Sequence, residues 1–272
     1  MEDNKILTDC HLHTRYSHDS KAEPEAMIRA GIAAGLTCIG ITDHYDFPSV
    51  DYPVDGTFDV DAYFEELLPL KEKYQEQIKV LIGIEMGLEP ERGAFFQDLR
   101  KKYPFDYAIG STHIVKGRDP AVADIHQGRP DKEVYLEYFE EVLANVRACT
   151  AFDVLGHLDY AVRYGQGRDS TYHFEDYRDV FAEIFTEIIR RGKAIEINTA
   201  GLKYKLPFPH PQSSALKLYR NLGGKNVTIA SDGHQPEQLA YAFDKVPNYL
   251  AECGFSYYSE PQAGGFVQKY LI

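Results

Sequence analysis

The chain has 272 residues, of which 44% are hydrophobic, and this is enough apolar material for one barrel-sized domain or two small ones. Its formal net charge of −13 argues against nucleic acid as a partner, because nucleic-acid-binding proteins usually carry a basic surface, but it permits a small anionic substrate beside bound cations. No apolar run approaches the roughly 18 residues of a membrane span, so we expect no membrane partner.

Short apolar runs alternate with amphipathic segments along the chain. Seven runs predict buried strands, at residues 5–9, 37–42, 79–84, 106–110, 152–156, 193–197 and 226–230. The segments between them have helical periodicity, at residues 23–34, 59–77, 92–102, 131–148, 175–191 and 211–222. Pro24 in the first helical turn, and Gly35 and Gly192 just after two helices, are typical of helix boundaries.

This alternation predicts the fold class. Strands that alternate with helices form a mostly parallel sheet in α/β proteins. Seven repeats without a glycine-rich dinucleotide-binding turn favour a closed barrel over an open sheet. No linker or low-complexity tract divides the chain, so we expect a single domain over residues 1–272.

Residues that can bind metal lie at the end of each predicted strand or just after it. In chain order they are His11 and His13, Asp43 and His44, Glu85, His113, His157 and Asp159, Glu196 and Asn198, and Asp232 and His234. In an α/β barrel these strand ends meet on one face, so the side chains would converge there. Imidazoles and carboxylates without thiolates suit zinc, manganese or iron. The pattern therefore predicts a metal site with several ions.

These motifs also resemble a known family. The chain is similar to the polymerase and histidinol phosphatase (PHP) superfamily, whose motifs it carries in order as His11-x-His13, Thr42-Asp43-His44, Glu85, His113, His157 and Ser231-Asp232-Gly233-His234. The resemblance extends from Asp9 to about His234. It implies a distorted seven-stranded (β/α) barrel with a trinuclear centre of divalent ions.

The resemblance also implies how the ligands are shared. The first ion would be held by His11, His13, Glu85 and Asp232, the second by Glu85, His113 and His157, and the third by Asp19, His44 and His234. Asp19 stands eight residues after the first histidine, as in the family, but the neighbouring His18 is an alternative ligand. Asp43 and Asp159 are expected to orient neighbouring groups and not to bind metal directly.

Within the superfamily, the loop at 13–20 and the segments 110–113, 156–160 and 196–201 look like those of histidinol-phosphate phosphatases. This likeness implies hydrolysis of L-histidinol phosphate to L-histidinol and phosphate in histidine biosynthesis, by attack of a metal-bridging hydroxide. One alternative is a PHP-type phosphoesterase that acts on nucleotides, oligonucleotides or another small phosphomonoester. Another is a non-catalytic metal-binding or regulatory protein.

Beyond the metal ligands, we expect a cation to bind the phosphoryl group. Arg163 is the first candidate, because a planar guanidinium engages phosphate through two donors, and Lys203 is the second. A group near the third ion, such as His234 or Asp19, could protonate the leaving alkoxide.

The segments around the expected site include several tyrosines and long loops. Tyr45, Tyr52, Tyr160, Tyr164 and Tyr204 are expected near its mouth. Residues 46–61 and 116–128 read as long loops over the same face, and residues 254–272 as a terminal hairpin that covers a barrel edge.

The cysteine pattern bears on the cellular compartment. The sequence contains four scattered cysteines, Cys10, Cys38, Cys149 and Cys253. They form no C-x-x-C pair, so we expect free, packed thiols in a reducing cytoplasm. A cleaved signal peptide is not expected, because cleavage would remove His11 and His13.

Overall fold

The computed structural model describes residues 5–51, 53, 56–121 and 124–271. Its strands are β1 (Thr8–Leu12), β2 (Cys38–Ile41), β3 (His44–Tyr45), β4 (Lys79–Gly87), β5 (Tyr107–Ser111), β6 (Val154–Leu155), β7 (Ala194–Asn198), β8 (Val227–Ala230), β9 (Tyr257–Gln262) and β10 (Gly265–Tyr270). Its α-helices are α1 (Pro24–Ala33), α2 (Val60–Tyr74), α3 (Gly93–Lys102), α4 (Asp131–Ala148), α5 (Arg178–Arg190), α6 (Ala200–Lys203), α7 (Ser213–Asn221) and α8 (Val246–Glu252).

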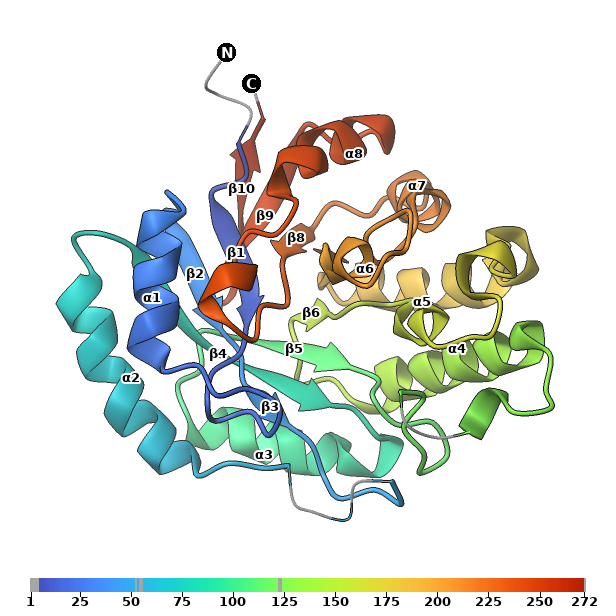
Figure 1. Ribbon diagram of the computed structural model, residues 1–272, viewed down its shortest axis with the longest axis horizontal. Helices are drawn as coiled ribbons and strands as arrows, with labels where there is room; N and C mark the ends of the chain where they lie inside the picture. The colour runs from blue at the N-terminus through green and yellow to red at the C-terminus, as the bar shows by residue number, and fades with distance from the viewer. Residues whose placement is uncertain (1–4, 52, 54–55, 122–123, 272) are drawn as a thin grey trace.

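The sheet is a nearly closed barrel of parallel strands with helices around it (Figure 1). The strand order is β1-β2-β4-β5-β6-β7-β8, and the short β3 pairs with the end of β4. The first and last strands meet where Leu12 bridges to Gly233 and the His13 amide donates to the Gly233 carbonyl over 2.9 Å. The predicted fold class is confirmed.

The predicted helices agree with the structure to within a few residues, but the first strand was wrong. It was predicted at residues 5–9 and instead runs from Thr8 to Leu12, so His11 lies within the strand and not beyond it. Every side chain of β1 is buried, including the polar Asp9 and His11. The predicted strand ended too early because the prediction relied on apolar side chains. Polar groups such as that of His11 are buried here as well, since they have hydrogen-bond partners.

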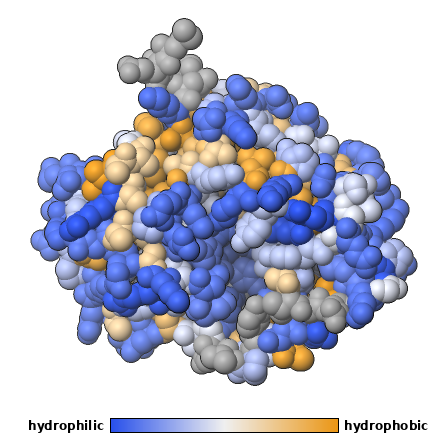
Figure 2. Space-filling model, viewed as in Figure 1, coloured by the Kyte–Doolittle hydropathy of each residue, from blue (hydrophilic) through white to orange (hydrophobic). Residues whose placement is uncertain are grey.

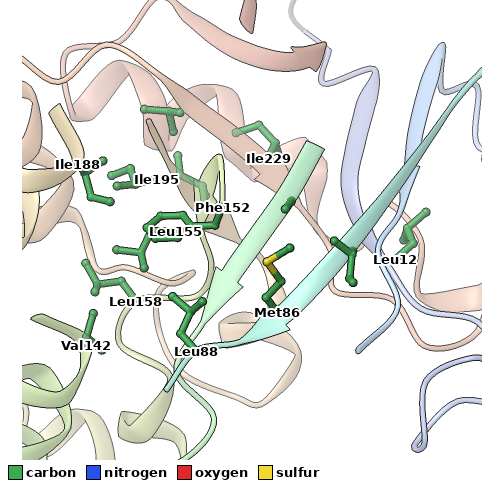
Figure 3. Close-up of a cluster of buried hydrophobic side chains, with 14 of the residues drawn as sticks. Leu12, Met86, Leu88, Val142, Phe152, Leu155, Leu158, Ile188, Ile195 and Ile229 are labelled. Carbon is green, nitrogen blue, oxygen red and sulfur yellow. The ribbon is translucent and has the colours of Figure 1, made fainter. Parts of the chain in front are cut away.

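Apolar side chains fill the space between the barrel and the surrounding helices. In Figure 3, Leu155 and Ile195 of neighbouring strands lie near Ile188 of α5 and Val142 of α4. Each such side chain contributes roughly 1.5–3 kcal/mol when it is fully buried. This packing holds the strand ends in fixed positions.

Inside the barrel, the ring of Tyr107 crosses the small residue Gly40. A Cβ at Gly40 would overlap the Tyr107 hydroxyl, which donates to the Cys10 carbonyl. The glycine is therefore needed for close approach across the barrel. All four cysteines are buried free thiols, as predicted.

The C-terminal hairpin of β9 and β10 packs against both edges of the sheet. Ser259 Oγ accepts from the Val227 amide of β8 over 3.2 Å, and Thr8 Oγ1 of β1 donates to Glu260 Oε2 over 2.9 Å. The predicted terminal hairpin is thus present at residues 257–270.

The surface in the orientation of Figure 2 is mostly hydrophilic and is hollowed near its centre. Hydrophobic side chains gather toward the end where the two chain termini lie. In the described part of the chain, no helix combines the length and the apolar character that crossing a membrane requires.

Candidate metal centre

Glu85 lies at the centre of a polar cluster at the carboxyl ends of the strands. It is near the end of β4 and pairs there with His44 of β3. Its Oε2 atom is 3.0 Å from His11 Nε2 and 2.9 Å from His44 Nδ1. Its Oε1 atom is 3.0 Å from His157 Nε2 and 3.3 Å from His113 Nε2. One fully buried carboxylate therefore faces imidazoles from four different strand ends.

Asp232 organises the other part of the cluster, just after β8. Its Oδ1 atom is 3.4 Å from His13 Nε2 and 3.6 Å from His234 Nδ1. On the other side of this imidazole, His234 Nε2 is 3.0 Å from Asp19 Oδ2. The loop after β1 and the segment after β8 thus meet over the barrel.

The structure brings all nine predicted metal ligands into one cluster. Three overlapping groups have ligand atoms within 4.8 Å of one another, namely His11–His13–Glu85, His44–Glu85–His113 and His13–His44–His234. Because the groups share members, the arrangement suits several neighbouring ions better than one isolated ion. The third group differs from the ligand set expected for the third ion, because it contains His13 where that set contains Asp19.

Asp19 and His18 both line the cavity above this cluster, but they face different groups. The Asp19 carboxylate lies against His234 and is also 3.7 Å from His44 Nε2. The ring centroid of His18 is 5.4 Å from that of His44. The Asp19 carboxylate therefore faces two other predicted ligands.

Buried atoms without hydrogen-bond partners test whether the cluster fits metal ions. Among the described side chains, His11 Nε2, His13 Nε2, His44 Nδ1 and Glu85 Oε2 are buried and make no hydrogen bond. Such groups cost free energy unless another partner satisfies them. All four point into the cluster, so a bound cation would satisfy them together.

Protonation of the cluster is shifted by burial and by neighbouring charges. Burial alone would raise the pKa of Glu85, but positive charge on His11, His44 and His113 holds this pKa well below its usual range. Burial, together with His234 and His44, holds the pKa of His13 well below its usual value. Although burial opposes it, neighbouring carboxylates conversely raise the pKa of His11 and His113, and that of His44 to about 9. Because neutral imidazoles bind metal, these three would lose a proton when an ion binds.

Carboxylates around the cluster orient its ligands. The His11 Nδ1 atom is 2.8 Å from Glu196 Oε1, and the His157 amide donates to Glu196 Oε2 over 2.9 Å. Asp46 Oδ1 lies 3.0 Å from His113 Nδ1. Because Nδ1 of His11 and of His113 is engaged by a carboxylate, the Nε2 atom of each ring points toward the cluster.

Other buried carboxylates hold the loops that carry the ligands. Asp43 accepts from the amide and hydroxyl of Thr14 and from those of Ser17, so it shapes the loop after β1. Asp9 accepts from the amide and hydroxyl of Ser231, and burial raises the pKa of Asp9 to about 6. Sequence reasoning gave no role to Asp9 or Asp46; the signal that could have found Asp46 is its position two residues after His44.

A cavity of about 550 Å³ opens above the metal ligands. Arg163, Lys203, Tyr160, Tyr164 and Tyr204 line it together with the predicted third-site residues. Its volume suits a small-molecule ligand. The expected phosphate-binding cations therefore lie beside the cluster.

Arg163 is buried at the end of the 3₁₀ helix η3 (Tyr160–Arg163). Its guanidinium lies over the rings of Tyr160 and Tyr204, at 4.9 and 4.5 Å from their centroids. The Nη2 atom is buried without a hydrogen bond and is 3.6 Å from Asp232 Oδ2. The guanidinium thus keeps donor capacity beside the cavity.

Lys203 is less available than Arg163 to donate hydrogen bonds to a phosphoryl group. Its Nζ donates to the Asp232 carbonyl over 2.9 Å and to Gln238 Oε1 over 3.3 Å. The ammonium therefore already holds the backbone at the ligand Asp232.

Not all of the predicted mouth tyrosines line the cavity. Tyr45 faces instead an aromatic group with Phe47 and Phe58, and Tyr52 lies outside the described residues. Parts of both predicted loops do line the cavity, including Phe47 and Asp119.

Comparisons with known proteins agree with this geometry. The PHP domain family matches residues 9–200. A probable histidinol-phosphatase of Clostridium acetobutylicum is 37% identical over 250 residues, which cover 91% of this chain and 94% of the relative. A histidinol-phosphatase of Lactococcus lactis is 30% identical over 257 residues, which cover 91% of each chain.

A solved structure has the same fold over nearly the whole chain. It is the histidinol phosphate phosphatase of Lactococcus lactis in complex with zinc, L-histidinol and phosphate. The TM-score is 0.86 at 27% sequence identity, and the match covers 97% of this chain and 99% of that one.

Proposed function

The chain belongs to the PHP domain family, and from this premise we propose that it is a histidinol-phosphatase, which hydrolyses L-histidinol phosphate to L-histidinol and phosphate. The observation that carries the proposal is the convergence of nine side chains of metal-binding type beneath a small cavity that a buried guanidinium also lines. The relatives and the zinc complex described above support the same reaction.

The proposal includes three divalent ions, of zinc, manganese or iron. Their ligands would be His11, His13, Glu85 and Asp232 for the first ion, Glu85, His113 and His157 for the second, and Asp19, His44 and His234 for the third. Bound there, the ions would supply a nucleophile at neutral pH and neutralise charge on the phosphoryl group. Glu196 and Asp46 orient the imidazoles of His11 and His113 for this purpose.

Arg163 binds the phosphoryl oxygens in this proposal. Its buried Nη2 needs an acceptor, and a phosphoryl oxygen in the cavity would provide one through a charge-assisted hydrogen bond. Tyr160 and Tyr204 hold the guanidinium plane. Asp19 and His234, which contact each other at the cavity wall, would hold the third ion where it could stabilise negative charge on the leaving alkoxide.

We propose that the whole chain acts as one domain, because the barrel strands span residues 8–230 and the terminal hairpin packs on both sheet edges. Four buried free thiols support a reducing cytoplasmic compartment.

The test is phosphate release by metal-replete protein from L-histidinol phosphate and from a panel of nucleotides. We expect turnover of L-histidinol phosphate to dominate. Efficient turnover of nucleotides with poor turnover of L-histidinol phosphate would instead support the broader phosphoesterase.

Replacement of Arg163 tests its part in the reaction. A charge-assisted contact contributes roughly 1.5–3 kcal/mol, so Arg163→Ala should lower kcat/KM by about 10- to 150-fold at about 1.4 kcal/mol per decade. Inorganic phosphate should inhibit this variant more weakly, with metal content unchanged. Arg100→Ala is a control, because Arg100 pairs with Asp153 and does not line the cavity. Parental kinetics of Arg163→Ala would transfer the role to Lys203.

A further inference from the structure

His210 lies behind Arg163 and sequence reasoning gave it no role. It follows α6 in the chain, and its backbone pairs with Asn198 at the end of β7 through bonds of 2.7 and 2.8 Å. Its side chain is fully buried and is not part of the cavity lining. Its position is therefore set by the barrel and not by a substrate.

The imidazole of His210 connects Asp159, the residue before η3, with Arg163 at the end of η3. Arg163 Nε donates to His210 Nε2 over 2.8 Å, and His210 Nδ1 contacts Asp159 Oδ1. Asp159 Oδ2 accepts from the Gln212 amide over 3.0 Å. Asp159, His210 and Arg163 thus form a continuous buried chain that ends in the cavity wall.

The hydrogen bonds among Asp159, His210 and Arg163 allow only one arrangement of protons. A guanidinium has only donors, so His210 Nε2 must accept and its proton must be on Nδ1. Asp159 then accepts from this Nδ1–H with one oxygen and from the Gln212 amide with the other. Burial and the charge of Arg163 lower the pKa of His210, which favours the neutral ring.

The bond to His210 also controls where the rest of the guanidinium points. Arg163 Nη2 is 3.6 Å from Asp232 Oδ2, which is too far for a hydrogen bond. A guanidinium free to turn could close this gap. It would then pair with Asp232, a predicted metal ligand, and its Nη2 would no longer donate into the cavity. Holding Nε prevents that turn.

We propose that His210 is a positioning residue that holds Arg163 in the orientation in which it binds the phosphoryl group, with Asp159 fixing the His210 tautomer. This inference rests on the proposed function of Arg163. It assigns to Asp159 a partner that is not a metal ligand.

Two amide variants separate the contacts of His210. In His210→Asn the shorter side chain can still donate to Asp159 but cannot reach Arg163, whereas His210→Gln is long enough to present an oxygen to Arg163 Nε. We expect His210→Asn to lower kcat/KM for L-histidinol phosphate by roughly 10- to 100-fold and to weaken inhibition by inorganic phosphate in parallel. His210→Gln should recover most of both.

Asp159→Asn tests the tautomer without changing the shape of the side chain. Both carboxylate oxygens accept, so an amide must direct its NH₂ group either at His210 or at the Gln212 amide. We expect this variant to weaken phosphate inhibition as His210→Asn does.

His126→Asn is the matched control for His210→Asn. Like His210, His126 is buried with its Nδ1 beside an aspartate, Asp131, and it lies outside the cavity lining. It should keep parental kinetics.

The double variant His210→Asn/Arg163→Ala decides whether His210 acts through Arg163. If it does, the double variant should equal Arg163→Ala to within about twofold, because coupled residues are not additive. Additive losses, or parental phosphate inhibition in His210→Asn, would overturn the inference.

The remaining outcomes separate the inference from the proposal on which it rests. Parental kinetics of Arg163→Ala would contradict the proposed role of Arg163 itself. If His210→Asn does not fold, the comparison between His210→Gln and Asp159→Asn decides, since only the second should weaken phosphate inhibition. Equal phosphate inhibition of these two variants would then overturn the inference.

Discussion

Glu85 is the residue on which the metal cluster depends most, because its two oxygens face imidazoles from opposite sides. Oε2 faces His11 and His44, and Oε1 faces His113 and His157. Loss of one carboxylate charge would therefore affect ligands of more than one ion.

Replacement of Glu85 by Gln should lower the occupancy of two metal sites together. The amide keeps the size of the side chain but removes the charge that bridges the two groups of imidazoles. Elemental analysis of protein purified without chelators would measure this loss. Glu260→Gln is the control, because Glu260 is also buried but pairs with Thr8 and Lys79 outside the cluster. Loss of a single ion from Glu85→Gln would show that Glu85 is not a bridge.

Asp19 and His18 should differ in their effect on turnover. Asp19 Oδ2 lies 3.0 Å from His234 Nε2 and 3.7 Å from His44 Nε2, whereas the ring centroid of His18 is 5.4 Å from that of His44. Asp19→Ala should reduce turnover by orders of magnitude and His18→Ala only mildly, as steady-state assays would show. The reverse ranking would make His18 the ligand.

The sequence contains a clearer signal for the nine predicted ligands than for the groups behind them. Most of the predicted ligands lie at or near the end of a strand, so the barrel architecture places them on one face; Asp19 lies in the loop after β1 and was assigned from the resemblance to the family. Asp46 follows the two-residue strand β3, which is too short for a periodic pattern. His210 contacts Arg163, which is 47 residues earlier in the chain, and only the folded loops bring them together.

At the scale of elements, side-chain periodicity predicted the helices well because their apolar stripes are long. The helix α4 was predicted at 131–148 and found at Asp131–Ala148, and Gly192 ends α5 with a φ of 67° as expected for a residue after a helix. The short helices α6 and α8 contain too few turns for such a pattern. The end of β1 could not be predicted, because burial of its polar residues depends on partners distant in sequence.

Lys193, the residue before β7, should make stability depend on pH. Its Nζ donates to the carbonyls of Thr150 and Phe152, and burial lowers its pKa to about 8. An unfolded lysine has a pKa of about 10.4, so between these values the unfolded chain binds more protons and stability rises with pH. The rise should be at most about 3 kcal/mol.

Urea unfolding between pH 7 and pH 10.5 would measure this rise. The unfolding free energy of the parent relative to that of Lys193→Met should increase over this range, because the buried thiols and tyrosines are common to both proteins, whereas the free energy of the parent relative to that of Lys101→Met, whose lysine is exposed, should stay constant. Equal slopes in all three proteins would show that the Lys193 ammonium is not destabilised by folding.

At the scale of the whole molecule, the barrel gathers ligands from residue 11 to residue 234 onto one face. The alternation of strands and helices was sufficient to predict this arrangement, because parallel strands connected through helices place their carboxyl ends together. The cavity above the ligands was less predictable, since its walls are loops such as 46–49 and the residues around Arg163. Their conformation depends on contacts between loops and not on periodicity.

Removal of the metal ions should destabilise the entire barrel. Ligands from the first, middle and last strands share the cluster, so each ion that binds only the folded chain adds to its stability by mass action. At ligand concentrations about 1,000 times Kd this contribution is about 4 kcal/mol per site, which for a chain of this size corresponds to a rise in Tm of roughly 10 °C. Thermal unfolding in a chelator and after addition of zinc, manganese or iron would measure the difference, and elemental analysis should find about three ions per chain. Glu85→Gln should respond much less to the chelator. A parental Tm that is unchanged by the chelator after the metal is lost, or a fully loaded protein with at most one ion, would contradict a trinuclear centre that holds the strand ends together.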